Sequence, residues 1–225
     1  RFGLVENSLV AGSSQVIGTQ LQGQLLEVRN SILVSAGEGL RISSAAAGRA
    51  ATVHVAQSTV SAAEACFHLE PPASPATVGP LQVFVGESVY YPALTDSSGA
   101  VLLVEDAHGG PQLPVEWWEG RTAISDRIVR FRVPDAARTA PQNLDEVWGR
   151  GWGPDHVEDL VTGPLSVIPF VQKVDLPKAQ PGDFRLGDKS LAATAGVDGG
   201  ALGADVDAVG PREVKADVPK KSATP

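Results

Sequence analysis

Hydrophobic and polar residues alternate in several short stretches of the N-terminal half of the chain. The clearest are 26–29 (LEVR), 53–56 (VHVA) and 81–85 (LQVFV), in which leucine or valine recurs at every second position. A period of two is typical of a β-strand with one buried face. We therefore expect a strand at each stretch, with the leucine and valine side chains pointing inward.

A shorter pattern follows the first two stretches. The triplets 40–42 (LRI) and 67–69 (FHL) are 27 residues apart, and each places a polar side chain between two large hydrophobic ones. We expect the first and third residues of one triplet to stack on their counterparts in the other, which buries them. The central residue, His68 in the second triplet, would point outward. Cys66 would share that face, which predicts a free thiol on the surface.

A repeated phrase joins these strands into one architecture. Four segments read LVENSLVAG, VRNSILVSAG, VAQSTVSAA and VGESVYY. Their shared serine falls at Ser8, Ser31, Ser58 and Ser88, in steps of 23, 27 and 30 residues. A repeat of this length with β-rich phrases is typical of a solenoid, in which each repeat is one coil stacked on the next. The pattern predicts an all-β fold of the parallel β-helix type.

An amide side chain precedes the serine in three of the four segments, at Asn7, Asn30 and Gln57. Amides stacked at a coil corner can hydrogen-bond to one another along the axis of the solenoid. We expect a structural role for these three residues rather than a binding role.

The repeat is clear in the N-terminal half of the chain and weakens after it, which suggests how the chain is divided into regions. Clear coils are expected over residues 1–105, irregular later coils over 106–165, a closing segment over 166–211 and a disordered tail over 212–225. The tail (REVKADVPKKSATP) is polar and contains proline, so it lacks the apolar residues needed to form a core.

Composition narrows the classes of partner. The chain of 225 residues has a formal net charge of −8, which argues against a nucleic-acid surface because such surfaces need clustered lysine and arginine. Its longest apolar stretches, such as 101–104 (VLLV), are far below the roughly 20 residues of a membrane-spanning helix. A single cysteine excludes an intrachain disulfide and leaves a cytoplasmic or extracytoplasmic location open.

The chain contains no methionine and begins at Arg1 in the middle of a repeated phrase. We expect it to be a fragment of a larger protein with further coils upstream. An open end of a solenoid exposes apolar core and unpaired strand edges. This predicts self-association through the N-terminal coil.

Two motifs stand near the C-terminus, 182–186 (GDFRL) and 201–211 (ALGADVDAVGP). Together they resemble the ending of many bacterial right-handed parallel β-helix proteins of the pectate-lyase-like class, although Leu191 replaces the usual proline and Ala201 the usual aspartate. The longer motif is similar to the ending of planctomycete-type proteins in which the β-helix follows a Ser/Thr protein kinase domain. The resemblance implies a right-handed parallel β-helix with irregular excursions and a C-terminal closing segment. The chain contains no Gly-rich loop, HRD or DFG motif, so any kinase activity would lie upstream.

Paired carboxylates on an outer strand face would indicate a polysaccharide lyase or hydrolase, which uses them to bind Ca²⁺ or as acid and base. The outward positions expected here are mixed in charge and place no two carboxylates together; they are Glu27, Arg29, Arg41, His54 and His68. The four histidines also lack the spacing of metal ligands. We therefore expect no catalytic residue, metal or cofactor in this chain.

Aromatic residues concentrate from the fourth repeated phrase onward. Tyr90, Tyr91, Trp117 and Trp118, together with Arg121, could form a platform that binds sugar or protein, because aromatic side chains dominate recognition surfaces. The alternative, which we favour, is that the aromatic residues pack the longer excursions onto the coils. We expect a non-catalytic interaction or scaffold domain whose partner is a protein or a carbohydrate. The alternative function is an extracytoplasmic carbohydrate-binding or carbohydrate-cleaving protein.

Overall fold

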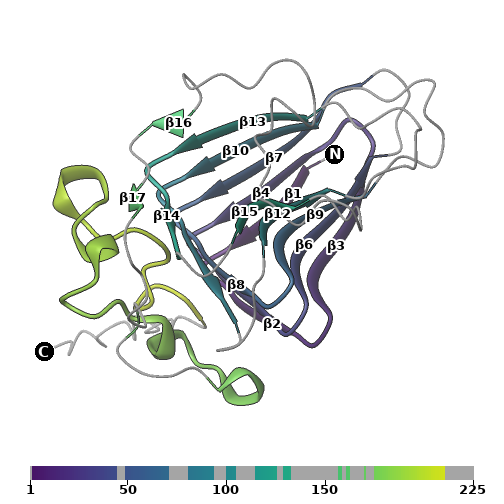
Figure 1. Ribbon diagram of the computed structural model, residues 1–225. Helices are drawn as coiled ribbons and strands as arrows, with labels where there is room; N and C mark the ends of the chain where they lie inside the picture. The colour runs from purple at the N-terminus through teal and green to yellow at the C-terminus, as the bar shows by residue number, and fades with distance from the viewer. Residues whose placement is uncertain are drawn as a thin grey trace, which may run out of the picture.

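The computed structural model describes residues 2–44, 49–70, 81–93, 100–104, 115–125, 129–132, 157–158, 161–162, 170 and 175–210. In this part of the chain the strands form three parallel sheets (Figure 1). Consecutive strands lie in different sheets, and each strand pairs with the third strand after it. We call one such set of three strands a coil.

Sheet A consists of β1 (Phe2–Glu6), β4 (Leu25–Arg29), β7 (Ala51–Ala56), β10 (Leu81–Gly86), β13 (Val115–Gly120) and β16 (Val157–Glu158). Sheet B consists of β2 (Leu9–Gly12), β5 (Ile32–Ser35), β8 (Thr59–Ala62), β11 (Val89–Pro92), β14 (Ala123–Ile124) and β17 (Val161–Thr162). Sheet C consists of β3 (Gln15–Leu21), β6 (Glu38–Ser44), β9 (Ala65–Glu70), β12 (Ala100–Val104) and β15 (Val129–Arg132).

The all-β class is confirmed for the described residues, which contain strands and short 3-10 helices but no α-helix. Accordingly, none of these residues belongs to a helix that could cross a membrane. The expected tail, 212–225, and most of the expected irregular coils, 106–165, lie outside the described residues.

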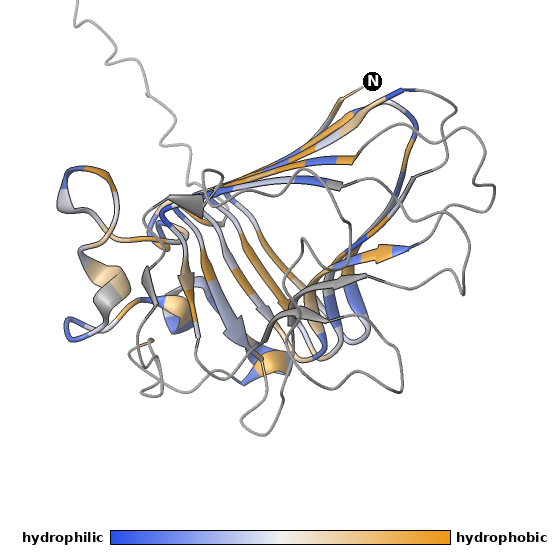
Figure 2. Cartoon of the chain, turned by 45° about the horizontal axis from the view of Figure 1, so that its top comes forward, coloured by the Kyte–Doolittle hydropathy of each residue, from blue (hydrophilic) through white to orange (hydrophobic). Residues whose placement is uncertain are grey.

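The expected stacking between strands is confirmed. In sheet C, Leu40 pairs with Phe67 and Ile42 pairs with Leu69, and all four side chains are fully buried. Figure 2 shows hydrophobic residues recurring at matching positions of neighbouring strands. Side chains of the same kind therefore lie above one another along the axis, and their burial stabilises the stack by roughly 1.5–3 kcal/mol for each large side chain.

Two predictions about sheet C are wrong. His68 is only 3% exposed and Cys66 only 1% exposed, so neither lies on an open surface. Cys66 and Phe67 are consecutive in β9, yet both belong to the core, so the alternation of inward and outward side chains breaks at Cys66. The Cys66 thiol belongs to the core and contacts the Val60 carbonyl at 3.8 Å. Burial raises the pKa of this thiol, so it is not the reactive surface group that was expected.

Each coil turns from sheet A to sheet B at one residue in the left-handed conformation. These corner residues have φ between 40° and 50°, and they are Asn7, Asn30, Gln57, Glu87 and Arg121. The expected amide ladder is present in part. Asn30 Nδ2 donates to Asn7 Oδ1 at 2.7 Å, and Gln57 Nε2 donates to Glu87 Oε2 at 3.3 Å.

The repeated serine follows the corner residue and links adjacent coils. The amide N–H groups of Ser8, Ser31 and Ser58 each donate to the hydroxyl oxygen of the serine in the next coil, at 3.2–3.3 Å. Each hydroxyl in turn donates to the carbonyl two residues before it, as Ser88 does to Gly86 at 2.8 Å. Ser31, Ser58 and Ser88 are fully buried. The serine therefore satisfies backbone groups that the sharp corner would otherwise leave unpaired.

A closing segment, residues 175–210, lies along the outer face of sheet B (Figure 1). Its short 3-10 helices are η3 (Leu176–Lys178), η4 (Pro181–Phe184), η5 (Leu191–Ala193) and η6 (Val197–Gly199). Phe184 packs with Ile32 and Val34 of β5, and Leu202 packs with Val89 of β11. The segment buries the side of sheet B that would otherwise be apolar and exposed.

The closing segment also hydrogen-bonds to four successive coils, at the corner residue in three of them and just after it, at Thr59, in the third coil. Gly203 N donates to Glu87 O at 2.7 Å, and Ala204 N to Thr59 Oγ1 at 3.2 Å. Asp205 N then donates to the Asn30 side-chain oxygen at 2.6 Å, and Gly210 N to Asn7 O at 2.9 Å. At Gly203 a Cβ atom would lie 2.6 Å from Thr59 Oγ1 and φ is +83°, so glycine is required there.

Strands β1, β2 and β3 stand at the ends of their sheets. On β1, Phe2 is 57% exposed and Leu4 is 49% exposed. Unpaired edges with exposed apolar side chains favour association with another strand edge. The expected self-association through this coil stays a prediction.

The stacking predicts a large effect of Phe67→Ala. Phe67 is fully buried and packs edge-on against Tyr90 and Trp117, so its loss leaves a cavity that should lower the free energy of unfolding by about 3–5 kcal/mol. Urea unfolding followed by circular dichroism measures this change. A loss below about 1 kcal/mol would contradict the central position of Phe67.

Candidate functional site

Four polar side chains contact one another on the outer face of sheet C. Glu38 and Arg41 come from β6, and His68 and Glu70 come from the neighbouring β9. The parallel register places Arg41 directly beside His68. We call this group the sheet C cluster.

Arg41 lies between the two carboxylates of the cluster. Its Nη2 and Nε donate to Glu70 Oε1 at 2.5 and 2.9 Å, and its Nη1 lies 3.7 Å from Glu38 Oε2. His68 Nδ1 contacts Glu38 Oε1 within hydrogen-bond reach. The His68 and Glu38 side chains are 4% and 9% exposed, whereas Arg41 is 39% exposed. The cluster thus has a buried inner pair and a partly solvated outer pair.

This arrangement corrects the expectation that no two carboxylates come together on an outer face. Glu38 and Glu70 are 32 residues apart in sequence, and only the pairing of β6 with β9 brings both to Arg41. A buried imidazole held by a carboxylate is chemically suited to accept or hold a proton. Among the described residues no group of three or more His, Cys, Asp or Glu side chains could hold a metal ion.

The outer face of sheet A carries a different arrangement. Phe84 on β10 and Trp118 on β13 are neighbours in the register and stack at 4.4 Å with an interplanar angle of 5°. His54 meets the Phe84 ring edge-on at 6.4 Å. On the same face Glu27 contacts both Arg29 and His54, the latter at 3.4 Å. The stacked rings are partly exposed, so this aromatic pair is accessible to a partner.

The predicted aromatic platform is not assembled on one surface. Trp117 and Tyr90 point into the core and are 1% and 0% exposed. Tyr91 packs against Phe170 at 5.3 Å, and Phe170 in turn packs against Phe184 of the closing segment at 5.4 Å. Trp118 lies on the outer face of sheet A, and Arg121 is the corner residue of its coil. Core packing is thus the observed role of Trp117 and Tyr90, and ligand binding by the other three stays a prediction.

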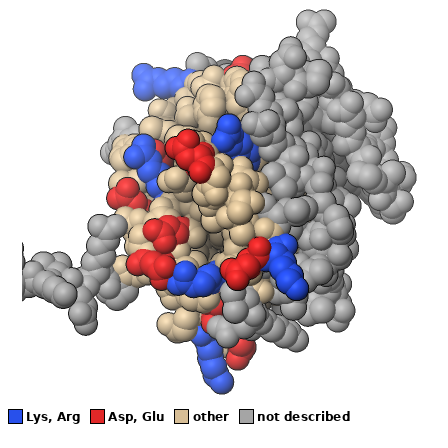
Figure 3. Space-filling model, turned by 90° about the vertical axis from the view of Figure 1, so that its left-hand side faces the viewer, with Lys and Arg blue, Asp and Glu red and all other residues tan. Residues whose placement is uncertain are grey.

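A groove of about 890 Å³ runs between the corners of the first three coils and the closing segment. Figure 3 looks onto this side of the molecule and shows acidic and basic side chains interspersed around a hollow. Asn30 and Arg29 line one wall, and Arg185 and Asp188 line the other. Arg185 donates to Asp207 at 3.0 and 2.5 Å, and this hydrogen bond lowers the pKa of the Asp207 carboxyl.

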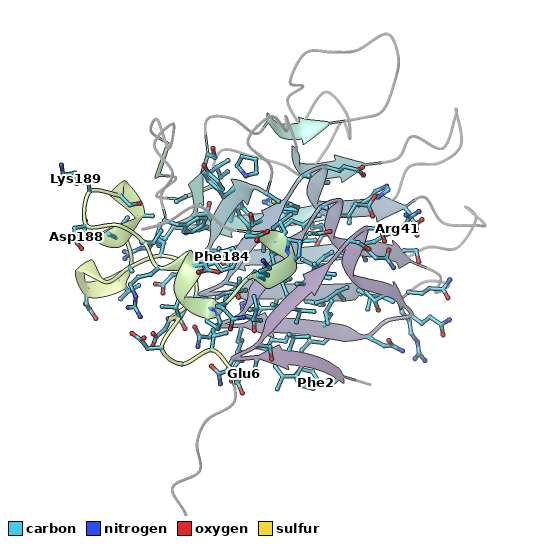
Figure 4. All side chains as sticks on the ribbon, turned by 90° about the horizontal axis from the view of Figure 1, so that it is seen from below. Phe2, Glu6, Arg41, Phe184, Asp188 and Lys189 are labelled. Carbon is cyan, nitrogen blue, oxygen red and sulfur yellow. The ribbon has the colours of Figure 1, made fainter. Side chains whose placement is uncertain are left out.

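The groove and the sheet C cluster are separate surfaces. Seen from below, Arg41 lies on the opposite side of the molecule from Asp188 and Lys189 of the closing segment (Figure 4). The sheet C cluster has no local sequence motif, because β6 and β9 belong to different coils. The groove, in contrast, is lined in part by the 182–186 and 201–211 motifs.

Comparison with known proteins does not assign a family. No family model, no curated protein and no solved structure matches the chain.

The buried inner pair predicts that His68→Ala is destabilising. The substitution removes the partner of a Glu38 side chain that is 9% exposed, which should lower the free energy of unfolding by about 1–3 kcal/mol. His54→Ala is the matched control, because this histidine also contacts a glutamate but is 42% exposed. Its effect should stay within about 0.5 kcal/mol. Equal effects of the two substitutions in urea unfolding would contradict the assignment.

Proposed function

We propose that the chain is a right-handed parallel β-helix domain that serves as a non-catalytic interaction or scaffold domain. Three parallel sheets in which each strand pairs with the third strand after it support the β-helix assignment. The resemblance of the 182–186 and 201–211 motifs to the ending of pectate-lyase-like β-helix proteins supports it as well.

One observation carries the scaffold role: charged side chains on the outer faces of the sheets form ion pairs with one another. Arg29 contacts Glu27 on sheet A, and Arg41 contacts Glu70 on sheet C. A catalytic acid or base must be within reach of its substrate, whereas Glu38 and His68 are largely buried. The stacked Phe84 and Trp118 are partly exposed, and aromatic side chains of this kind are typical anchors for a binding partner.

A second part of the proposal concerns the larger protein to which the chain would belong. The 201–211 ending is similar to that of planctomycete-type proteins with a Ser/Thr kinase domain before the β-helix. We propose that the chain is part of a bacterial protein of that organisation, in which it would dock or position a partner of the kinase. The sequence of the complete reading frame tests this part of the proposal, and the absence of an upstream kinase domain would overturn it.

One observation favours a second candidate function, a polysaccharide lyase or hydrolase. The sheet C cluster brings Glu38 and Glu70 to the same arginine. Carboxylates that share a site can divide the roles of acid and base. Cleavage of an acidic polysaccharide would require the buried inner pair to become accessible to the polymer.

The scaffold proposal predicts no cleavage of uronic acid polymers. The chain is incubated with polygalacturonate, with and without Ca²⁺, and unsaturated product is followed by ultraviolet absorbance. We expect no turnover, because the charged groups of the outer faces are engaged with one another. Turnover that Arg41→Ala abolishes would instead establish the lyase function at the sheet C cluster.

A second assay on the same protein tests whether it binds a carbohydrate polymer without cleaving it. Retardation in native gels that contain the polymer would show binding without cleavage. Trp118→Ala would weaken such binding if the aromatic pair is the contact. Val197→Ala is the control, because Val197 is 51% exposed but lies on the closing segment.

A further inference from the structure

One inward position of sheet A breaks the apolar pattern of the core. The register aligns Glu119 with valines of the four preceding coils, which are Val5, Val28, Val55 and Val85. Glu119 is 3% exposed. Moving a carboxylate out of water is costly unless hydrogen bonds compensate for the lost solvation.

Donors surround this carboxylate. Trp117 Nε1 donates to Glu119 Oε2 at 3.2 Å, and Thr122 Oγ1 donates to Glu119 Oε1. Thr122 follows the corner residue of its coil and is fully buried. The carboxylate is thus held inside the protein by side chains of its own coil.

A second polar group lies inside the preceding coil. Tyr90 occupies an inward column of sheet B, where it pairs with Val60 on one side and Ile124 on the other. Its side chain is fully buried, and its hydroxyl has no hydrogen-bond partner among the described protein groups. A buried hydroxyl without a partner costs about 1–3 kcal/mol.

Tyr90 and Glu119 share neighbours in the core. The Tyr90 ring packs against Phe67 at 5.8 Å, and the Trp117 ring, whose Nε1 donates to Glu119, packs against Phe67 at 5.1 Å. The pKa of Tyr90 is raised first by burial, then by the negative charge of Glu119 and then by Cys66. Glu119 is on β13 of sheet A and Tyr90 is on β11 of sheet B, so the two residues lie on either side of the corner between these sheets, on adjacent coils. The hydroxyl is a donor and the carboxylate is an acceptor, so a molecule that both donates and accepts can join them.

We propose that the interior of the fourth and fifth coils is a hydration site, in which one buried water accepts from Tyr90 Oη and donates to the Glu119 carboxylate. Buried waters in proteins make two to four hydrogen bonds to polar groups that lack other partners. The site would keep Tyr90 and Glu119 satisfied at positions that are apolar in the earlier coils. This inference does not depend on the proposed function.

Tyr90→Phe tests the site with little change in volume. If a water joins the two groups, the substitution removes one of its partners, and the equilibrium constant for urea unfolding should rise about tenfold. If the hydroxyl has no partner, removing it relieves a desolvation cost, and the constant should stay the same or fall. The second result would overturn the proposal.

A high-resolution crystal structure of the unsubstituted protein provides an independent measurement. We expect density for a water within hydrogen-bond distance of both Tyr90 Oη and the Glu119 carboxylate, and its loss in crystals of Tyr90→Phe. A dry interior, or a direct hydrogen bond from Tyr90 to Glu119, would contradict the inference.

Discussion

Each coil depends on one residue that the chain holds in the left-handed conformation, between sheet A and sheet B. None of the five corner residues is glycine, although this conformation costs a residue with a side chain roughly 1–2 kcal/mol. Hydrogen bonds between coils offset the cost. The backbone N–H of Asn30 donates to Ala56 O, and the next N–H, that of Ser31, donates to Ser58 Oγ. The corner therefore forms only when a neighbouring coil supplies the acceptors, which couples each coil to the next.

The closing segment extends this dependence across the molecule. It bonds first to the corner of the fourth coil at Glu87 and last to that of the first coil at Asn7. At the second coil Asn30 has two roles, because its amide nitrogen donates to Asn7 while its oxygen accepts from Asp205 N. The corners and the closing segment are thus one hydrogen-bonded system, and the apolar contacts with sheet B hold it in place.

The sequence was sufficient to predict the strands and their stacking, because alternation and repeat length are local signals. Leu40 and Phe67 could be paired from spacing alone. The surfaces could not be predicted in this way. Alternation assigns a side chain to a face but does not tell whether that face is covered, so the burial of His68 was missed. The burial of Cys66 was missed because strict alternation fails there: Cys66 and Phe67 are consecutive, yet both are core residues. Glu38 and Glu70 meet at Arg41 only through strand pairing, and no local motif signals such a contact.

The hydrogen bonds between the repeated serines of adjacent coils can be tested one at a time by amide hydrogen exchange in Ser58→Ala. This substitution removes the acceptor of the Ser31 N–H, whereas the Ser58 N–H still donates to Ser88 Oγ. After correction for any loss of global stability, exchange at Ser31 should become about tenfold faster, and exchange at residue 58 should stay unchanged. Equal acceleration at both amides, or none at Ser31, would contradict the claim that the serine hydroxyls couple the coils.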